Sequence, residues 1–273
     1  MAERFNKLSE RLSMNFSQRQ LKNMAIRCSE KIRNANFDVE YFEFPYKHIV
    51  IDDFFDPKLA DLCLQSFPDL SDEGWEYAND TDIEIKFRTT WKSEFDIPEG
   101  IVDAVRIMNS SFFLSAMGEK FEISKVISDP YFTGGGLNAT RRGGLLDVHV
   151  DGNYHDATGL SRRLNALLYL NPNWMPSWGG EFGIYDEHGD KCIKQIAPLF
   201  NRIVIFETHD KSFHGLPAPL NFPEGEVRRS ILLYYYTKAP RPDYQIVVRE
   251  PHSALWKKRG LNDKRGNKTR NFE

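Results

Sequence analysis

The part of the chain that follows Tyr131 is a succession of short strand-like runs, and this feature constrains the fold most. The runs expected to form strands are 137–140, 146–150, 164–170, 181–185, 192–196, 202–206 and 229–237. The pairs that separate several of them are turn formers, namely Gly143-Gly144, Asn171-Pro172, Gly179-Gly180 and Gly189-Asp190. Many short strands with turn residues between them predict a sandwich or a jelly-roll barrel and disfavour a parallel α/β sheet.

The first half of the chain carries helical signals instead. Apolar residues recur at helical spacing among charged ones over 4–35, which predicts a helix that packs on the core. Asp56 and Pro57 form an N-cap and first-turn pair for a second helix, and a third is expected over 100–117. The acidic region 71–94 has a mixed pattern and is expected to form loops. The fold class is therefore mainly β with flanking helices.

These patterns divide the chain into three parts. An N-terminal helical extension is expected over 1–40, the main domain over 41–245 and a basic C-terminal tail over 246–273. Within the main domain, the helices are expected over 56–118 and the jelly-roll core over about 130–238. The tail is rich in lysine and arginine, and it is expected to be a solvated segment.

Composition bounds the class of protein and its compartment. With 273 residues, 41% of them hydrophobic and 27% charged, the chain is long enough to bury a full core. A net charge of −3 disfavours a nucleic-acid partner. No run approaches the roughly 18 apolar residues that cross a membrane. The three cysteines are scattered and include no CxxC pair, a usage typical of a reducing cytoplasm, so a cytoplasmic protein is expected. The oligomeric state stays open.

One strand-like run carries a pair of metal-ligand residues. His149 and Asp151 flank a single valine, and because side chains alternate along a strand, both project from the same face. His214 lies several strand lengths later, in a short run that ends in a turn, and can supply a third ligand. Two histidines and one carboxylate on one face, with coordination positions left open, match the facial triad of non-haem Fe(II) oxygenases.

An arginine on a later strand-like run adds to these three candidate ligands. An HxD triplet alone is common by chance, and a lone strand histidine is more often structural. Arg228 follows the last of these histidines at the start of a strand-like run, and its planar guanidinium suits a carboxylate. A dicarboxylate such as 2-oxoglutarate can chelate iron through its 2-oxo acid end while its far carboxylate pairs with Arg228. Strand alternation places Arg228 and Ser230 on one face and Arg229 on the other.

These motifs resemble the Fe(II)/2-oxoglutarate-dependent dioxygenases of the prolyl 4-hydroxylase type. The segment 46–55, followed by a helix, is similar to the N-terminal part of the ribosomal-protein prolyl hydroxylases. The resemblance spans roughly residues 44–237. Its motifs are HVD at 149–151, YLNP at 169–172, WGGE at 178–181, FNRIVIF at 200–206, HG at 214–215 and RRSI at 228–231. The fold that it implies is a double-stranded β-helix, a jelly-roll and cupin-like core.

The resemblance also implies roles for residues and cofactors. The implied iron ligands are His149, Asp151 and His214. Arg228 would hold the far carboxylate of 2-oxoglutarate, with Tyr169 and Ser230 as helpers; it is preferred over Arg229 because the family's arginine stands two residues before a serine. The implied cofactors are Fe(II), 2-oxoglutarate as cosubstrate and O₂, with ascorbate as an optional addition. Family members often carry a tyrosine on the first barrel strand near the cosubstrate, whereas the run 137–140 has none.

The implied reaction is hydroxylation of a C–H bond with decarboxylation of 2-oxoglutarate to succinate. Asp151 favours hydroxylation, because related halogenases lack that carboxylate. A prolyl residue in a protein or peptide is the expected substrate, while a free amino acid, a sugar or another small metabolite stays open because fold does not fix substrate. Related nucleic-acid demethylases carry RxNxTxR on the last strand, where this chain reads RRSILLY. A non-catalytic jelly-roll module that binds a metal or a sugar, and a zinc hydrolase with the same ligands, remain as alternatives.

Overall fold

The computed structural model of the protein describes residues 16–258 and 269–270. Its helices are α2 (Gln18–Arg33), α3 (Pro57–Gln65), α4 (Glu99–Met108) and α5 (Ser111–Lys120). The strands before the barrel core are β1 (Tyr41–Phe42), β2 (His48–Ile51), β3 (Trp75–Asp80), β4 (Glu84–Thr89) and β5 (Ile127–Ser128). The strands that follow are β6 (Gly136–Thr140), β7 (Leu145–Val150), β8 (Ser161–Tyr169), β9 (Phe182–Tyr185), β10 (Cys192–Ile196), β11 (Ile203–Glu207), β12 (His214–Leu216), β13 (Arg228–Thr237), β14 (Leu255–Lys257) and β15 (Thr269–Arg270).

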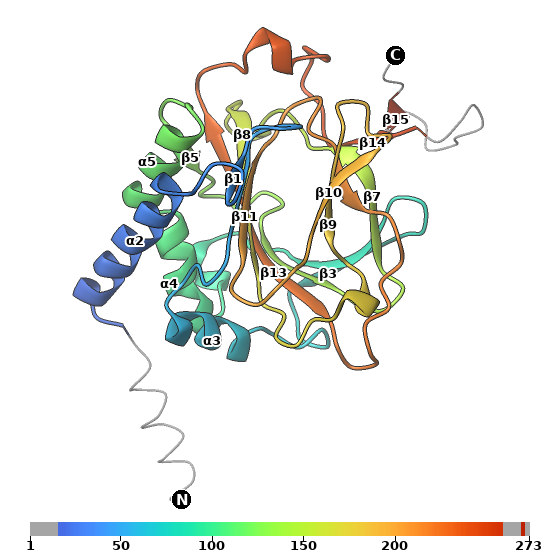
Figure 1. The fold of residues 1–273 in the computed structure, drawn as a ribbon. Helices are drawn as coiled ribbons and strands as arrows, with labels where there is room; N and C mark the ends of the chain where they lie inside the picture. The colour runs from blue at the N-terminus through green and yellow to red at the C-terminus, as the bar shows by residue number, and fades with distance from the viewer. Residues whose placement is uncertain (1–15, 259–268, 271–273) are drawn as a thin grey trace, which may run out of the picture.

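Within the described residues, the strands form one curled sheet that is antiparallel except where β14 pairs with β15. Its main path runs β1-β2-β11-β8-β13-β6-β4-β7-β12-β9-β10, so strands far apart in the sequence become neighbours (Figure 1). Every strand expected after Tyr131 is present, with bounds within a few residues of the expectation. The predicted fold class, a mainly β chain with flanking helices and a double-stranded β-helix core, is confirmed.

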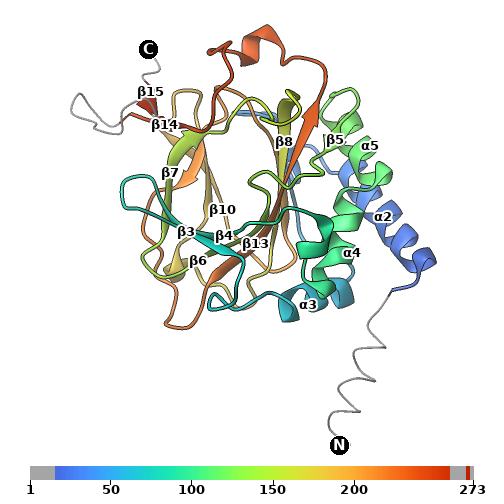
Figure 2. The same ribbon diagram turned by 180° about the vertical axis from the view of Figure 1, so that it is seen from behind.

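The helices gather on one side of the barrel, as the two opposite views show (Figures 1 and 2). The side chains of strand β8 pack on both sides of the sheet, against the helices on one side and inside the barrel on the other. Leu164 and Leu168 pack in the large cluster that contains the helices, whereas Leu167 and Tyr169 belong to a second cluster inside the barrel. Because successive side chains point to opposite faces of a strand, one apolar run supplies both cores. Asn165 shares the inner face, and its contact with the site is described below.

Two predicted helices differ from the structure in their extent. Helix α2 begins after Ser17, whose side chain accepts a hydrogen bond from the Gln20 amide in a capping box. Residues 1–15 of the predicted 4–35 helix lie outside the described part of the chain. The helix expected over 100–117 is two helices, because the Ser110 side chain caps the second one by accepting from the Phe113 amide. No helix in the described ranges is long and apolar enough to cross a membrane.

The region 71–94, expected to form loops, contains the hairpin of β3 and β4. Arg88 and Glu76 face each other across the hairpin as a two-bond ion pair, and Tyr77 stacks on Phe87 with ring centroids 4.5 Å apart. Most of these residues are half-exposed, so the pattern lacks the apolar alternation that reveals a strand with one buried face. The hairpin is held by cross-strand pairs, and β4 joins the barrel between β6 and β7.

Part of the expected solvated tail also belongs to the barrel. Strand β14 pairs with the end of β7, where Trp256 stands opposite His149, and Trp256 is buried. Burial of the large apolar ring of Trp256 stabilises this pairing, although the surrounding sequence is basic. Both β4 and β14 therefore pair with β7, β4 near its start and β14 near its end.

Asn201 ties the turn before β11 to the segment before α3. Its side-chain oxygen accepts from the Phe55 amide at 2.9 Å, and its side-chain nitrogen donates to the Phe55 carbonyl at 2.9 Å. Its backbone has φ 58, in the left-handed region that asparagine tolerates better than most residues. Asn201 is 2% exposed, so water cannot replace these bonds.

Replacing Asn201 with alanine is expected to lower the free energy of unfolding by about 2–4 kcal/mol, because two buried backbone groups lose their partners and alanine is strained at this φ. Urea unfolding at neutral pH measures the change. Asn173→Ala is the matched control, since Asn173 also has a positive φ, 62, but is exposed. An equal loss in both variants would assign the effect to the backbone and contradict the role of the hydrogen bonds.

Candidate metal centre

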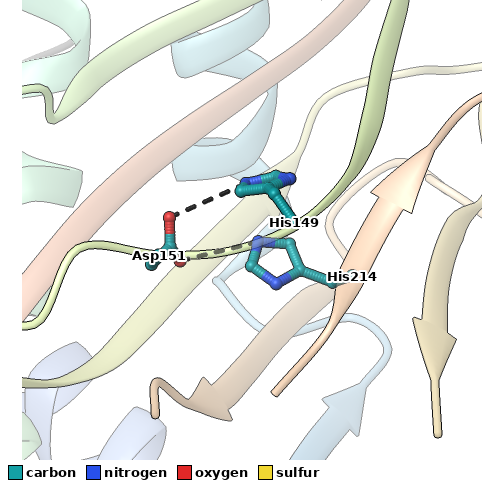
Figure 3. Close-up of side chains that lie close together, drawn as sticks. All are labelled: His149, Asp151 and His214. Carbon is teal, nitrogen blue, oxygen red and sulfur yellow. Dashed lines mark ion pairs between the residues drawn. The ribbon is translucent and has the colours of Figure 1, made fainter. Parts of the chain in front are cut away.

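His149, Asp151 and His214 come together inside the barrel. His149 is the penultimate residue of β7, Asp151 directly follows that strand, and His214 is the first residue of β12, where it is the cross-strand partner of His149. The His214 Nε2 lies 3.5 Å and the His149 Nε2 3.8 Å from carboxylate oxygens of Asp151 (Figure 3). One ligand atom from each residue falls within 4.8 Å of the others, and all three residues are buried.

Backbone carbonyls fix the orientation of both imidazoles. The Nδ1 of His149 donates to the Asp147 carbonyl at 2.8 Å, and the Nδ1 of His214 donates to the Ser212 carbonyl at 3.0 Å. Each Nε2 is then the unprotonated nitrogen and carries its lone pair toward the centre. Burial lowers the pKa of His149 to about 3 and also lowers the pKa of His214, so both rings are neutral near pH 7 and able to coordinate a metal.

Asp151 is held as a carboxylate by groups from β8. The Asn165 side-chain nitrogen donates to its Oδ2 at 2.7 Å, and the Arg162 guanidinium lies 3.3 Å from the same oxygen. Burial opposes ionisation, but the charge of Arg162 and the Asn165 hydrogen bond favour the carboxylate, and the pKa of Asp151 lies well below its usual range. The second oxygen, Oδ1, is directed toward His149.

This donor set fits iron. Two imidazole nitrogens and one carboxylate oxygen converge from one side, an arrangement that leaves coordination positions for a cosubstrate and O₂ and is diagnostic of non-haem Fe(II) oxygenases. The same ligands also accept zinc, whose catalytic sites likewise have three protein ligands and an open position. The residues around the ligands therefore decide between the two.

A cavity of about 70 Å³ leads from the three ligands to Arg228. Arg228 is 5% exposed; its Nε donates to the Gly180 carbonyl at 2.7 Å and its Nη2 to the Tyr169 hydroxyl at 3.2 Å. Ser230 is the cross-strand partner of Tyr169 and also lines the cavity. A side chain on Gly180 would meet the Arg228 side chain at 3.1 Å, and its φ of 84 also favours glycine. These contacts fix the guanidinium in the wall of the cavity that the three ligands also line.

Arg229 points to a different part of the molecule. Its guanidinium lies 3.7 Å from Glu226 and donates to the Val227 carbonyl, and it lines a separate cavity on the outside of the sheet. The alternation along β13 thus separates the two arginines, as the sequence predicts.

Several residues around the ligands are not evident from the sequence. The Arg162 guanidinium also lies over the Tyr234 ring, 3.5 Å from its centroid, and Trp256 packs against His149 with tilted rings whose centroids are 4.6 Å apart. Lys86 and Asn138 line the inner cavity. The sequence offers one signal for such residues, which is a polar side chain within an apolar strand, as at Arg162 and Asn165. Lys86 and Trp256 carry no such signal, because they lie in segments that were expected to be a loop and a tail.

An open groove of about 630 Å³ leads from the ligands to the surface. Its walls come from the β3–β4 hairpin, the segment 131–134, the loop after Asp151, β13 and the C-terminal segment. The aromatic residues that line it are Trp91, Tyr131, Phe132, Tyr154, Tyr234, Tyr236 and Trp256. The groove and the inner cavity share His149 and Asp151, so a bound substrate and a cosubstrate would meet at the metal.

The C-terminal wall of this groove is anchored by Asp210. Its carboxylate accepts from Arg241 at 3.0 Å, from His252 at 3.2 Å and from the amides of Val247 and Val248 at 2.7 Å each. Although burial raises its pKa, the hydrogen bonds from His252 and the two amides, together with the charge of Arg241, lower the pKa of Asp210 to about 2.

Because the folded-state pKa of Asp210 is depressed, its contribution to stability is present above about pH 4 and is lost as the pH falls toward 2. The shift from an ordinary aspartate corresponds to about 2 kcal/mol at neutral pH. We expect the difference in unfolding free energy between wild type and Asp210→Asn, measured in urea, to shrink over this range. Asp243→Asn removes an exposed carboxylate and should show no such trend. A difference that does not change with pH would contradict the assignment.

Comparison with known proteins agrees with this geometry. Residues 135–236 match the model of the 2OG-Fe(II) oxygenase superfamily. A segment of 106 residues is 32% identical to prolyl 3-hydroxylase OGFOD1 of Xenopus laevis, covering 36% of this chain and 20% of that protein. The mouse protein of the same name is 33% identical over 106 residues, covering 36% of this chain and 19% of its own length. The chain thus spans about a fifth of the length of the curated relatives it matches.

Two solved structures share the fold. A prolyl hydroxylase from Trichoplax adhaerens, in complex with a hypoxia inducible factor peptide fragment, superposes with a TM-score of 0.56 at 17% identity, covering 82% of this chain and 94% of that one. A Pseudomonas putida prolyl-4-hydroxylase superposes with a TM-score of 0.54 at 15% identity, covering 78% and 98%. The fold and the ligand set define a double-stranded β-helix with a candidate metal centre. Over residues 135–236 the chain is similar to the 2OG-Fe(II) oxygenase superfamily, whose name refers to 2-oxoglutarate and Fe(II).

Proposed function

We propose that the chain is an Fe(II)- and 2-oxoglutarate-dependent hydroxylase. The observation that carries this proposal is one cavity lined both by the three metal-ligand residues and by the buried Arg228. When bound, iron, 2-oxoglutarate and O₂ supply an oxidant that inserts one oxygen atom into a C–H bond, while 2-oxoglutarate becomes succinate and CO₂. A zinc hydrolase with the same ligands would have no use for a buried arginine aimed at a second carboxylate.

The chain's own residues position the reactants. His149, Asp151 and His214 hold the iron, their orientation set by the carbonyls and by Asn165 described above. Arg228 holds the far carboxylate of 2-oxoglutarate, with the Tyr169 hydroxyl and Ser230 beside it. Burial of these groups excludes water and strengthens the ion pair, because charges interact more strongly where the local dielectric is low.

The proposed substrate is a prolyl residue in a protein or peptide. Relatives over the matched segment carry the name prolyl 3-hydroxylase. The groove above the ligands is open and lined by aromatic rings, and grooves of this kind dock proline-rich segments in other proteins. A free amino acid would leave most of a groove of about 630 Å³ unfilled.

We also propose the domain division and the compartment. Residues 41–245 would act as the catalytic domain, with 1–40 as a helical extension and 246–273 as a C-terminal segment. All three cysteines are free, two of them buried, which supports a reducing compartment such as the cytoplasm. Ascorbate is proposed only as an additive that sustains turnover.

The experiment that tests the function measures succinate release with Fe(II), 2-oxoglutarate and a library of proline-containing peptides, including ribosomal-protein segments. Mass spectrometry then detects the gain of one oxygen atom in a peptide. We expect Fe(II)-dependent succinate in wild type and none above background in His149→Ala. Equal succinate release in the two proteins would reject the proposal, and oxygen gain by free amino acids but not by peptides would reject the substrate.

A further inference from the structure

The inner cavity contains two hydrogen-bond donors that the proposed function does not use. Lys86 comes from β4 and Asn138 from β6, two strands that pair directly with each other. Both line the cavity that joins the three ligands to Arg228. Their position suggests that they bind part of the cosubstrate that Arg228 does not reach.

The Asn138 side-chain nitrogen is a buried donor without an acceptor. It is shielded from solvent and has no hydrogen-bond partner within the described part of the chain. Asn138 is the cross-strand partner of Ser230, so its side chain shares the inner face with the residues that define the cavity. An amide left unpaired costs free energy, which an anionic guest in the cavity would recover.

Lys86 places a second positive charge at the ligand end of the cavity. Its ammonium lies 2.9 Å from Glu84, and its side chain is 18% exposed. An ion pair between neighbours on an accessible hairpin contributes little to stability. Lys86 also lines the outer groove, so it lies where the cavity opens toward the metal.

We propose that Lys86 and Asn138 bind the carboxylate of the 2-oxo acid group, the one next to the metal, while Arg228 holds the far carboxylate. This inference rests on the proposed function. A dicarboxylate that chelates the metal through its 2-oxo acid end presents one carboxylate beside the histidines and the other at Arg228. Of the lysine and the arginine that line this cavity, Lys86 also lines the outer groove with His149 and Asp151, whereas Arg228 does not. The β3–β4 hairpin would then be part of the cosubstrate site.

Ligand truncation separates the two carboxylates. The probes are 2-oxoglutarate and 2-oxopentanoate, which keeps the 2-oxo acid but lacks the far carboxylate, titrated by calorimetry into the Mn(II)-loaded protein. We expect Lys86→Met to weaken both probes by the same factor, about tenfold or more, because a hydrogen-bonded charge is lost in each complex. Arg228→Met should weaken 2-oxoglutarate alone. Asn138→Ala should weaken both probes by a smaller common factor.

Two further variants control for charge and fold. Lys22→Met removes an exposed lysine on α2 and should change neither affinity, whereas Lys86→Arg should restore part of the loss. If Lys86→Met does not fold, Asn138→Ala carries the same test. Unchanged affinities, or a loss confined to 2-oxoglutarate, would overturn the assignment of the near carboxylate. Failure of the metal-loaded wild type to bind 2-oxoglutarate at all would instead overturn the proposed function itself.

Discussion

Replacement of Asp151 with alanine is expected to abolish metal binding and Fe(II)-dependent succinate release. The carboxylate is one of three ligands, and since loss of an outer-shell partner alone costs about 10–100-fold in other metal sites, loss of a ligand should exceed about 100-fold. Metal content after dialysis and succinate release measure the two effects. Asp243→Ala removes an exposed carboxylate and serves as the control. Full metal content and turnover in Asp151→Ala would reject its role as a ligand.

The same substitution should also destabilise the protein. Arg162 is buried against Asp151, and without that carboxylate its charge faces neutral groups such as the Asn165 side chain and the Tyr234 ring. Removing one partner of a buried ion pair typically costs about 3–5 kcal/mol. Urea unfolding of the metal-free proteins isolates this effect from metal binding, and the double variant Asp151→Ala with Arg162→Met should recover part of it.

Arg228→Met is expected to weaken 2-oxoglutarate binding by about 30-fold or more while the protein retains its metal. A buried guanidinium paired with a carboxylate is worth several kcal/mol when one partner is truncated. Arg228→Lys should not restore the affinity. A guanidinium can donate to Gly180 and Tyr169 and still present further N–H groups to the ligand, whereas a lysine ammonium lacks this planar geometry. Calorimetry of the metal-loaded protein measures this loss.

Arg229→Met is the matched control for Arg228. Its guanidinium lies beside Glu226 on the outer side of the sheet, and its loss should leave 2-oxoglutarate affinity within a factor of about two. The reverse result, with Arg229 required and Arg228 dispensable, would mean that the register assigned to β13 is wrong by one residue.

Local patterns predicted much of the barrel. Strand β10 has the bounds expected from the sequence, and the alternation that places His149 and Asp151 on one face needs no knowledge of the fold. The position of His214 beside His149 cannot be read from a local pattern, because it depends on the pairing of β7 with β12, two strands that are far apart in the sequence. The resemblance to a known family supplied that link.

The parts that escaped prediction share a physical cause. The β3–β4 hairpin is half-exposed on both faces and is held by charge and ring pairs, so it lacks an apolar period. Strand β14 depends on one buried tryptophan inside a basic segment. Lys86 and Trp256 lie on these two elements, which is why the walls of the site were less predictable than its ligands.

The most direct test of the central claim is the visible absorption of the anaerobic Fe(II) protein on addition of 2-oxoglutarate. Chelation by a 2-oxo acid gives Fe(II) a charge-transfer band that zinc cannot give. We predict that the band forms in wild type, is absent in Asp151→Ala for lack of iron, and requires a higher 2-oxoglutarate concentration in Arg228→Met. A wild-type protein that retains Fe(II) yet develops no band at saturating 2-oxoglutarate would contradict the account.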